Sequence, residues 1–163
     1  MTDLAWLFPW LLFLHVLGAI VAFGPTFGFS IIGAMGGGEP QHANFATRVS
    51  AAISHKLVYP IGITLPITGA LMILVAGIDL SSRAYWWLGL GIVLYIIAYG
   101  YSFFVQSKLV HRVIEMTSTP PPPGASGPPP ELRALIVRIQ RGGMALGVLL
   151  VAIVLLMVVK PQF

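Results

Sequence analysis

The residues best suited to chemistry in this chain of 163 residues lie inside its apolar segments, where an ionisable side chain is rare without a role. His15 is the one titratable candidate near the middle of such a segment. It follows Trp6 by nine residues, which places it roughly 13 Å along a helix from that tryptophan. Thr68 and Tyr95 fall at a similar depth in two other segments. We therefore predict a weakly polar seam at one level, formed by His15, Thr68 and Tyr95.

His15 supports two interpretations. Imidazole is an axial ligand of haem, a metal ligand and a proton carrier, so this residue is a candidate for any of these roles. The structural alternative is a neutral histidine that forms a hydrogen bond with Tyr95, Thr68 or a backbone carbonyl. Because no second histidine lies at this depth, a haem would need Tyr95, a methionine or a partner chain as its other ligand.

A second group of candidates is basic. His55 and Lys56 precede one apolar segment, whereas His111 and Arg112 follow another. Such residues could form a pocket for a haem propionate, a lipid phosphate or a quinone headgroup. The alternative is that they are ordinary topology charges with histidines at the membrane interface. We treat His55 and His111 as the weaker cofactor-binding candidates and predict no metal site.

The overall composition identifies the kind of element that must position these side chains. Hydrophobic residues make up 57% of the chain, charged residues only 9%, and the mean hydropathy is +0.90. A soluble domain carries roughly a quarter charged residues, so a soluble enzyme of this size is excluded. The absence of cysteine also excludes disulfides, thiolate metal sites and iron–sulfur clusters.

Four apolar segments predict an all-α integral membrane four-helix bundle in a single domain, residues 1–163. The predicted spans are about 4–35, 57–78, 85–105 and 142–159. About 20 apolar residues cross a bilayer as a helix, and helices satisfy their own backbone hydrogen bonds in lipid. The first segment is longer than this, so it must tilt, kink at Pro25 or project from the membrane.

The connections between the segments differ in character. Residues 36–50 are polar and rich in glycine, and residues 79–84 form a short turn. Residues 117–131 form a proline-rich linker, for which we expect an extended conformation; it is either a spacer or a docking site for a proline-binding module. After it, Glu131–Arg141 has the pattern of an interfacial helix leading into the fourth span.

The basic residues predict the orientation. One side of the membrane receives seven of the nine Lys and Arg residues, and the other receives only Arg83 and Lys160. By the positive-inside rule, both termini face the outer (periplasmic or extracellular) side and the proline-rich linker lies in the cytoplasm. All four tryptophans lie at the outer edge, as in an aromatic belt. The expected location is the bacterial cytoplasmic (inner) membrane.

Three stretches of sequence carry a family resemblance: LLFLHVLGAIVAFGPTFG, RVSAAISHKLVYPIGITLPITGALMI and RGGMALGVLLVAIVLLMVVKP. The chain resembles the bacterial integral membrane proteins of domain of unknown function family 2269, which implies a four-helix membrane bundle without an established activity. The LHVLGA segment is also similar to the first spans of CopD-type copper-resistance proteins and HemJ-type protoporphyrinogen oxidases. In the latter, a first-span histidine is associated with haem or porphyrin chemistry, a role that this resemblance transfers to His15 alone.

Two functional hypotheses follow. The first is a non-catalytic structural or accessory subunit of a larger membrane complex, because small residues four apart, Gly24 with Gly28 and Gly143 with Gly147, allow helices to approach closely. The alternative is a haem- or porphyrin-binding membrane redox protein that uses His15, with haem b as its cofactor. The expected partners are the lipid bilayer and other membrane subunits or further copies of the chain. Nucleic acid is not expected.

Overall fold

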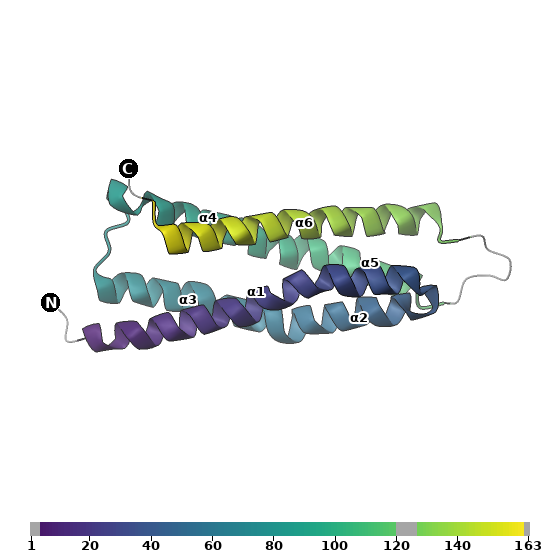
Figure 1. Ribbon diagram of the computed structural model, residues 1–163, viewed down its shortest axis with the longest axis horizontal. Coiled ribbons are helices and arrows are strands. Elements are labelled where there is room, and N and C mark those ends of the chain that lie inside the picture. Colours follow the sequence, from purple (N-terminus) through teal and green to yellow (C-terminus); the bar gives the residue numbers. More distant parts are fainter. Residues whose placement is uncertain (1–3, 120–126, 162–163) are drawn as a thin grey trace.

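Four long helical rods lie side by side in the computed structural model, which describes residues 4–119 and 127–161 (Figure 1). The first rod comprises η1 (Ala5–Leu7) and α1 (Phe8–Gly38). The second comprises η2 (Pro40–His42), α2 (Ala43–Ile53), η3 (Ser54–Val58) and α3 (Tyr59–Ala76). The third comprises η4 (Arg83–Tyr85), α4 (Trp86–Tyr101), η5 (Ser102–Gln106) and α5 (Ser107–Met116), and the fourth is α6 (Pro130–Val159). The predicted all-α class is confirmed.

Each rod is long and apolar enough to cross a membrane. The four candidate spans are helical over 34, 37, 34 and 30 residues, as is expected for a four-span membrane bundle. At 1.5 Å per residue these rods measure about 45–55 Å, which exceeds the ~30 Å of a hydrocarbon core. Part of the bundle therefore extends beyond the lipid.

The tryptophans indicate which end of the bundle lies at a membrane surface. Trp6 and Trp10 begin the first rod, and Trp86 and Trp87 begin α4, at the end of the bundle where both ends of the chain are drawn (Figure 1). The Lys160 ammonium lies 5.9 Å from the centre of the Trp87 ring. Arg83, which begins η4, also lies at this end, whereas the other seven Lys and Arg residues lie on the rods toward the opposite end. The extra helical length is therefore at that opposite, basic end.

The prediction that residues 36–50 form a connection is wrong except at Glu39, because α1 continues to Gly38 and η2 begins at Pro40. The chain reverses direction at Glu39 and continues at once as η2 and α2. The absence of a side chain at Gly36 permits this tight hairpin, because a Cβ atom built there would lie only 2.8 Å from the Cβ of Ala46. Asn44 then ties α2 to α5, since its amide donates to the Ile114 carbonyl and to the Thr117 hydroxyl, both at 3.0 Å.

The fourth rod also differs from expectation. The predicted interfacial helix Glu131–Arg141 and the fourth span are one continuous helix, α6. The first rod is likewise helical through Pro25. Of the proline-rich linker 117–131, residues 120–126 lie outside the described residues.

The connection between α3 and η4 is short. Helix α3 ends at Gly77, whose φ of 63° lies in the left-handed region that favours glycine. The Asp79 carboxylate then accepts hydrogen bonds from the hydroxyl and the N–H of Ser81, at 2.7 and 2.9 Å. These two bonds lower the pKa of Asp79 because they favour its charged form.

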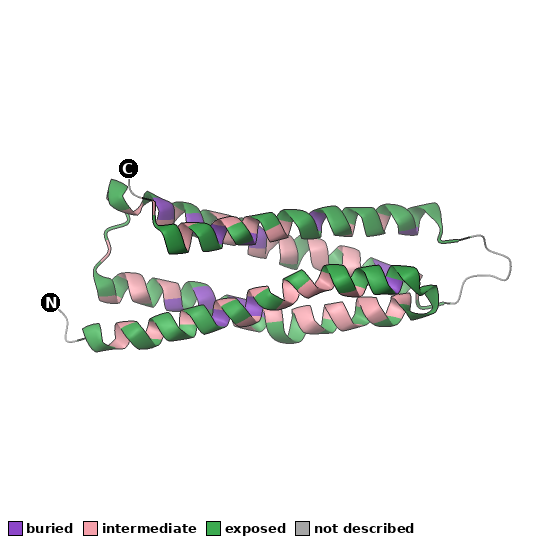
Figure 2. Ribbon diagram, viewed as in Figure 1, coloured by how far each residue is buried: buried purple, intermediate pink, exposed green. Residues whose placement is uncertain are grey.

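The interior of the bundle is thin. Buried residues form a narrow line on the facing sides of the rods, whereas the outward faces are exposed (Figure 2). A buried hydrophobic cluster consists of Ala98, Leu150 and Ile153, where α4 meets α6. The outward faces carry large apolar side chains, as expected where lipid replaces water.

Candidate functional site

His15 and Thr68 form a direct contact between α1 and α3. The His15 Nδ1 atom lies 2.8 Å from the Thr68 hydroxyl oxygen. The imidazole also packs against Gly69, where a Cβ atom would lie 3.4 Å from Cε1, at ordinary van der Waals distance. On the other helix, a Cβ atom on Gly18 would lie 3.2 Å from Leu65. The structure therefore brings together two of the three residues predicted to share one level.

The hydrogen bonds of Thr68 indicate which tautomer His15 adopts. The Thr68 hydroxyl donates to the carbonyls of Thr64 and Leu65, at 2.9 and 3.1 Å. Because a hydroxyl has only one proton, we infer that Thr68 accepts from His15 and that Nδ1 carries the imidazole proton. The Nε2 atom then carries the lone pair, which is the form of histidine that can bind a metal ion or accept a proton.

Tyr95, the third predicted member, has a different partner. Its hydroxyl donates to the Gly62 carbonyl at 2.6 Å. Gly62 precedes Thr68 by six residues, about 9 Å along α3. The Tyr95 ring stacks on Tyr99, with ring centres 5.9 Å apart, and tilts against Phe23. Tyr95 therefore belongs to a separate group of aromatic residues.

This group is an aromatic ladder of Tyr59, Tyr95, Tyr99 and Phe103, in which each tyrosine donates to a backbone carbonyl of the neighbouring rod. The Tyr99 hydroxyl bonds the Tyr59 carbonyl and the Tyr59 hydroxyl bonds the Ser102 carbonyl, both at 3.0 Å. Gly62 provides the space for the ladder, because a Cβ atom there would lie 2.8 Å from the Tyr99 ring. The spacing of Tyr95 and Tyr99 indicates a shared face, but the role of Tyr59 is evident only in the structure.

Two π-helical turns frame one end of the aromatic ladder. On the second rod, η3 directly precedes Tyr59. On the third rod, η5 follows Tyr99 and begins at Ser102, whose carbonyl accepts the hydrogen bond from Tyr59. A π-turn loosens the regular backbone hydrogen bonding, and such turns often occur at functional sites. The Tyr59 hydroxyl thus bonds a carbonyl at the place where regular helical pairing is interrupted.

A small cavity lies between the aromatic ladder and the other two rods. Its volume is about 50 Å³, and its lining includes Thr26, Tyr59, Tyr95, Tyr99 and Leu146. Pockets for cofactors or drug-sized ligands measure about 300–1,000 Å³. This cavity is large enough for water but not for a porphyrin, and His15 is not among its lining residues.

The structure also brings together His55 and His111, which are 56 residues apart in sequence. Their Nε2 atoms are 3.3 Å apart, and their ring centres are separated by 5.3 Å. His55 also packs edge-to-face against the Tyr59 ring, with ring centres 5.2 Å apart. Of the other residues of the predicted basic pocket, Arg112 pairs with Glu131 at 3.4 Å.

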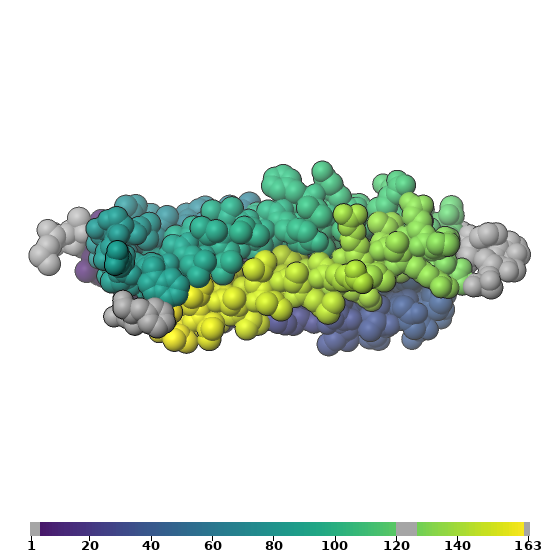
Figure 3. All heavy atoms as spheres, turned by 90° about the horizontal axis from the view of Figure 1, so that it is seen from above, coloured from purple at the N-terminus to yellow at the C-terminus, as the bar shows by residue number. Residues whose placement is uncertain are grey.

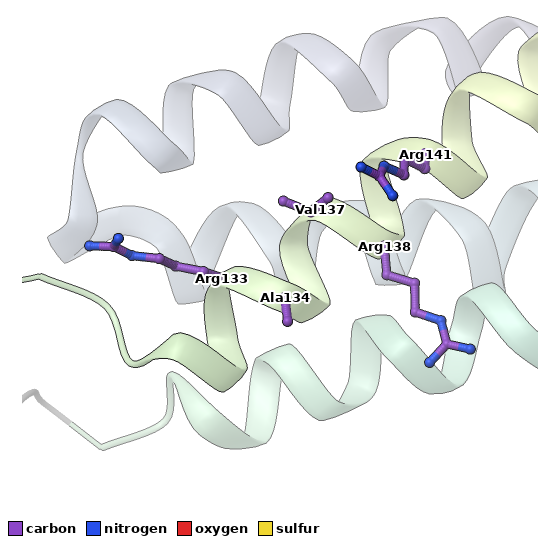
Figure 4. A pocket seen from close by; sticks show the side chains of 5 residues that line it. All are labelled: Arg133, Ala134, Val137, Arg138 and Arg141. Atoms are coloured by element: carbon purple, nitrogen blue, oxygen red, sulfur yellow. The ribbon is translucent and has the colours of Figure 1, made fainter.

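A separate basic hollow lies on α6. It encloses about 500 Å³ and is lined by Arg133, Ala134, Val137, Arg138 and Arg141. Figure 4 shows that the guanidinium groups of Arg133 and Arg138 extend in different directions from the helix. The arginines therefore do not converge on one point, and the hollow offers a basic surface rather than a defined ligand site.

Comparison with known proteins gives one match. The model of the family described as "Predicted integral membrane protein (DUF2269)" matches residues 9–161, nearly the whole chain. No curated protein and no solved structure matches the chain. The resemblance inferred from the three apolar stretches is confirmed, and the match includes His15, Thr68, His55 and His111.

Proposed function

Because this chain belongs to the DUF2269 family of predicted integral membrane proteins, we propose a role that requires no catalytic residues: it is a structural or accessory subunit of a larger membrane complex. The observation that carries this proposal is the division of its glycines into two sets. One set lies in close contacts within the bundle, and the other faces away from every part of the chain that the structure describes.

Glycines of the first set hold the bundle together. A Cβ atom on Gly62 or Gly142 would lie less than 3 Å from a side chain of a neighbouring rod. Glycines of the second set have no such neighbour. Built Cβ atoms on Gly24, Gly28 and Gly147 meet no atom of the described residues within 4 Å.

The second set has the spacing of a helix-packing motif. Gly24 and Gly28 are four residues apart on α1. On α6, Gly147 follows Gly143 at the same spacing, although a Cβ atom on Gly143 would lie 4.0 Å from the Gln106 amide nitrogen. Small residues four apart allow another transmembrane helix to approach closely. Large apolar side chains flank them, with Phe27 56% and Val148 70% exposed. Figure 3 shows α6 uncovered along one side of the molecule, which leaves room for another helix.

Purification in mild detergent tests this proposal. We expect the wild-type chain to be recovered with a second subunit or a second copy in fixed proportion, and Gly24→Leu with Gly28→Leu to abolish that association without unfolding the monomer. The matched control is Gly100→Leu, at another glycine without a neighbour within 4 Å but outside these motifs, which should leave the association intact. Consistent recovery of a lone wild-type monomer would contradict the proposal.

A haem- or porphyrin-binding redox role is the second candidate, and the observation in its favour is the orientation of His15. Thr68 holds Nδ1, so Nε2 is the nitrogen available to a haem iron; a hydrogen bond on the far nitrogen is usual for metal-binding histidines. The absorption spectrum of the purified protein, with and without dithionite, tests it. A Soret band that disappears in His15→Ala supports haem b, and the lack of any band in preparations from haem-replete cells removes this candidate.

The orientation and location proposed from the sequence are part of the same model. Both termini would face outward across a bacterial inner membrane, and the seven basic residues at the far end of the bundle would face the cytoplasm. The positive-inside rule supports this choice. Reporter fusions at Phe163 test it, since a cytoplasmic signal would reverse the orientation.

A further inference from the structure

The pair formed by His55 and His111 has no part in the proposed subunit role or in the His15 site. His55 precedes Ala76, the end of α3, by 21 residues, about 30 Å along the rod. Because the hydrocarbon core is ~30 Å thick, the pair lies at the membrane surface opposite the tryptophans. Both side chains are exposed.

The separation of the two Nε2 atoms is the feature that suggests a function. Each ring directs Nε2 at the other, at 3.3 Å. Two nitrogens bound to one tetrahedral zinc ion at about 2.0–2.1 Å are about 3.3–3.4 Å apart. The imidazoles therefore already have the separation that two ligands of one metal ion require.

We propose that His55 and His111 form a two-histidine binding site for a divalent transition-metal ion of the zinc and copper class. Imidazole is a preferred ligand of both ions, whereas hard cations such as Mg²⁺ prefer oxygen. The described residues contain no group of three or more His, Asp or Glu side chains that could hold a metal ion. The protein thus supplies two ligands, and water or a partner molecule completes the coordination.

Several features of the bundle hold the pair in place. His55 lies in η3 and His111 in α5, so each histidine is fixed by a different long rod. Edge-to-face packing of His55 against Tyr59 restricts one ring, and Tyr59 is itself buried and bonded to Ser102. A bound metal would therefore link the second and third rods at the membrane surface.

The charged residues near His55 and His111 limit the affinity of the pair for a metal ion. Lys56, Lys108 and Arg112 are close to the pair in sequence and repel a cation. Arg112 is partly neutralised by Glu131 at 3.4 Å and Glu115 at 4.0 Å. We therefore expect a site that binds more tightly at high ionic strength, which screens this repulsion, and that fails at low pH, where protonated imidazoles cannot bind a metal.

Zinc titration of the full-length protein tests the proposal. The protein is purified in detergent with a tag that contains no histidine, stripped with a chelator, and titrated with Zn²⁺ alone in a calorimeter. We expect one zinc ion per chain and a rise in thermal stability on binding. Even the loss of a residue that only hydrogen-bonds to a metal ligand weakens metal binding by about 10- to 100-fold, so His55→Gln or His111→Gln should weaken it by about tenfold or more.

Another histidine provides a matched control. His42→Gln removes an exposed histidine near the same end and should leave zinc binding unchanged. Retained helical circular dichroism in each variant establishes that it has folded, and His111→Cys should bind zinc again because a thiolate is a zinc ligand. Binding unaffected by His55→Gln and His111→Gln, or no binding by the folded wild-type protein, would overturn the proposal.

Discussion

The two ends of the bundle are held together by different interactions. In the membrane half, which comprises α3, α4, residues 8–27 and residues 142–159, glycines and tyrosines make the closest contacts between rods. In the basic extension, which comprises α2, α5, residues 28–38 and residues 130–141, polar and charged side chains join the rods, as with Asn44 and Arg112. The same four rods thus pack by different means along their length.

The surrounding medium explains this difference. Lipid tails are as apolar as leucine, so helices in the membrane associate through close packing and hydrogen bonds rather than by avoiding water. Small residues are useful there because they let backbones approach. Outside the lipid, burial of apolar side chains stabilises the bundle again, as Val113 and Leu132 illustrate, while the outward faces carry charge.

Enlarging Gly62 should produce the greatest loss of stability in the membrane half. In Gly62→Val, the new side chain would overlap the Tyr99 ring, since even a Cβ atom would lie 2.8 Å from it. Overpacking of this kind reduces the free energy of unfolding by about 1–3 kcal/mol. Thermal unfolding in detergent measures it, with Gly24→Val, where nothing lies within 4 Å, as the control. Equal stability of the two variants would contradict the role of Gly62.

In the basic extension, Asn44→Ala should have the next largest effect. The substitution removes the two hydrogen bonds to Ile114 and Thr117 at the end of α5. Each is worth about 0.5–1.5 kcal/mol, so we expect a loss of about 1–2 kcal/mol and faster hydrogen exchange in α2 and α5. Gln41→Ala, an exposed amide of the same end without a hydrogen bond among the described residues, is the control. Exchange that accelerates in α3 instead would indicate that the two regions are not separate.

Removal of the Tyr99 hydroxyl should have a smaller effect. Tyr99→Phe keeps the ring and its stacking but loses the bond to the Tyr59 carbonyl. Hydrogen bonds between transmembrane helices contribute about 0.6 kcal/mol on average, and a loss of that size is expected in thermal unfolding. Tyr85→Phe, whose hydroxyl has no partner in the described part of the chain, should be neutral. A loss several times larger would mean that the aromatic ladder acts cooperatively.

The ion pair of Arg112 with Glu131 should contribute least. Both side chains are more than half exposed, and exposed pairs are worth about 0–1 kcal/mol. We expect Arg112→Gln to change stability by less than about 0.5 kcal/mol at low salt and not measurably at high salt. Unfolding of the variant at two salt concentrations tests this. A large effect that persists in high salt would show that the basic extension depends on this pair.

Some features of the candidate site follow from local sequence and others do not. The sequence predicts that His15 and Thr68 lie at one level, because the rise of a helix converts sequence spacing into depth. The depth of each residue is counted from an aromatic or apolar boundary of its segment. Tyr95 has the same nominal depth, yet it bonds Gly62, since its position depends on how α4 is shifted and rotated against α3. The hairpin at Glu39 was missed because glycines that usually break helices also allow two helices to pack closely.

The sequence alone determined that the chain lies in a membrane, how many spans it has and how its charge is divided between the two ends. These properties depend on composition and on the length of apolar segments. The tertiary structure decided which side chains meet. Only the packing of the rods separates the glycines in contact from those facing outward, and only that packing brings Nε2 of His55 within 3.3 Å of Nε2 of His111. Hydropathy is a sum along the chain, whereas a binding site depends on rotations and shifts between helices that no local pattern encodes.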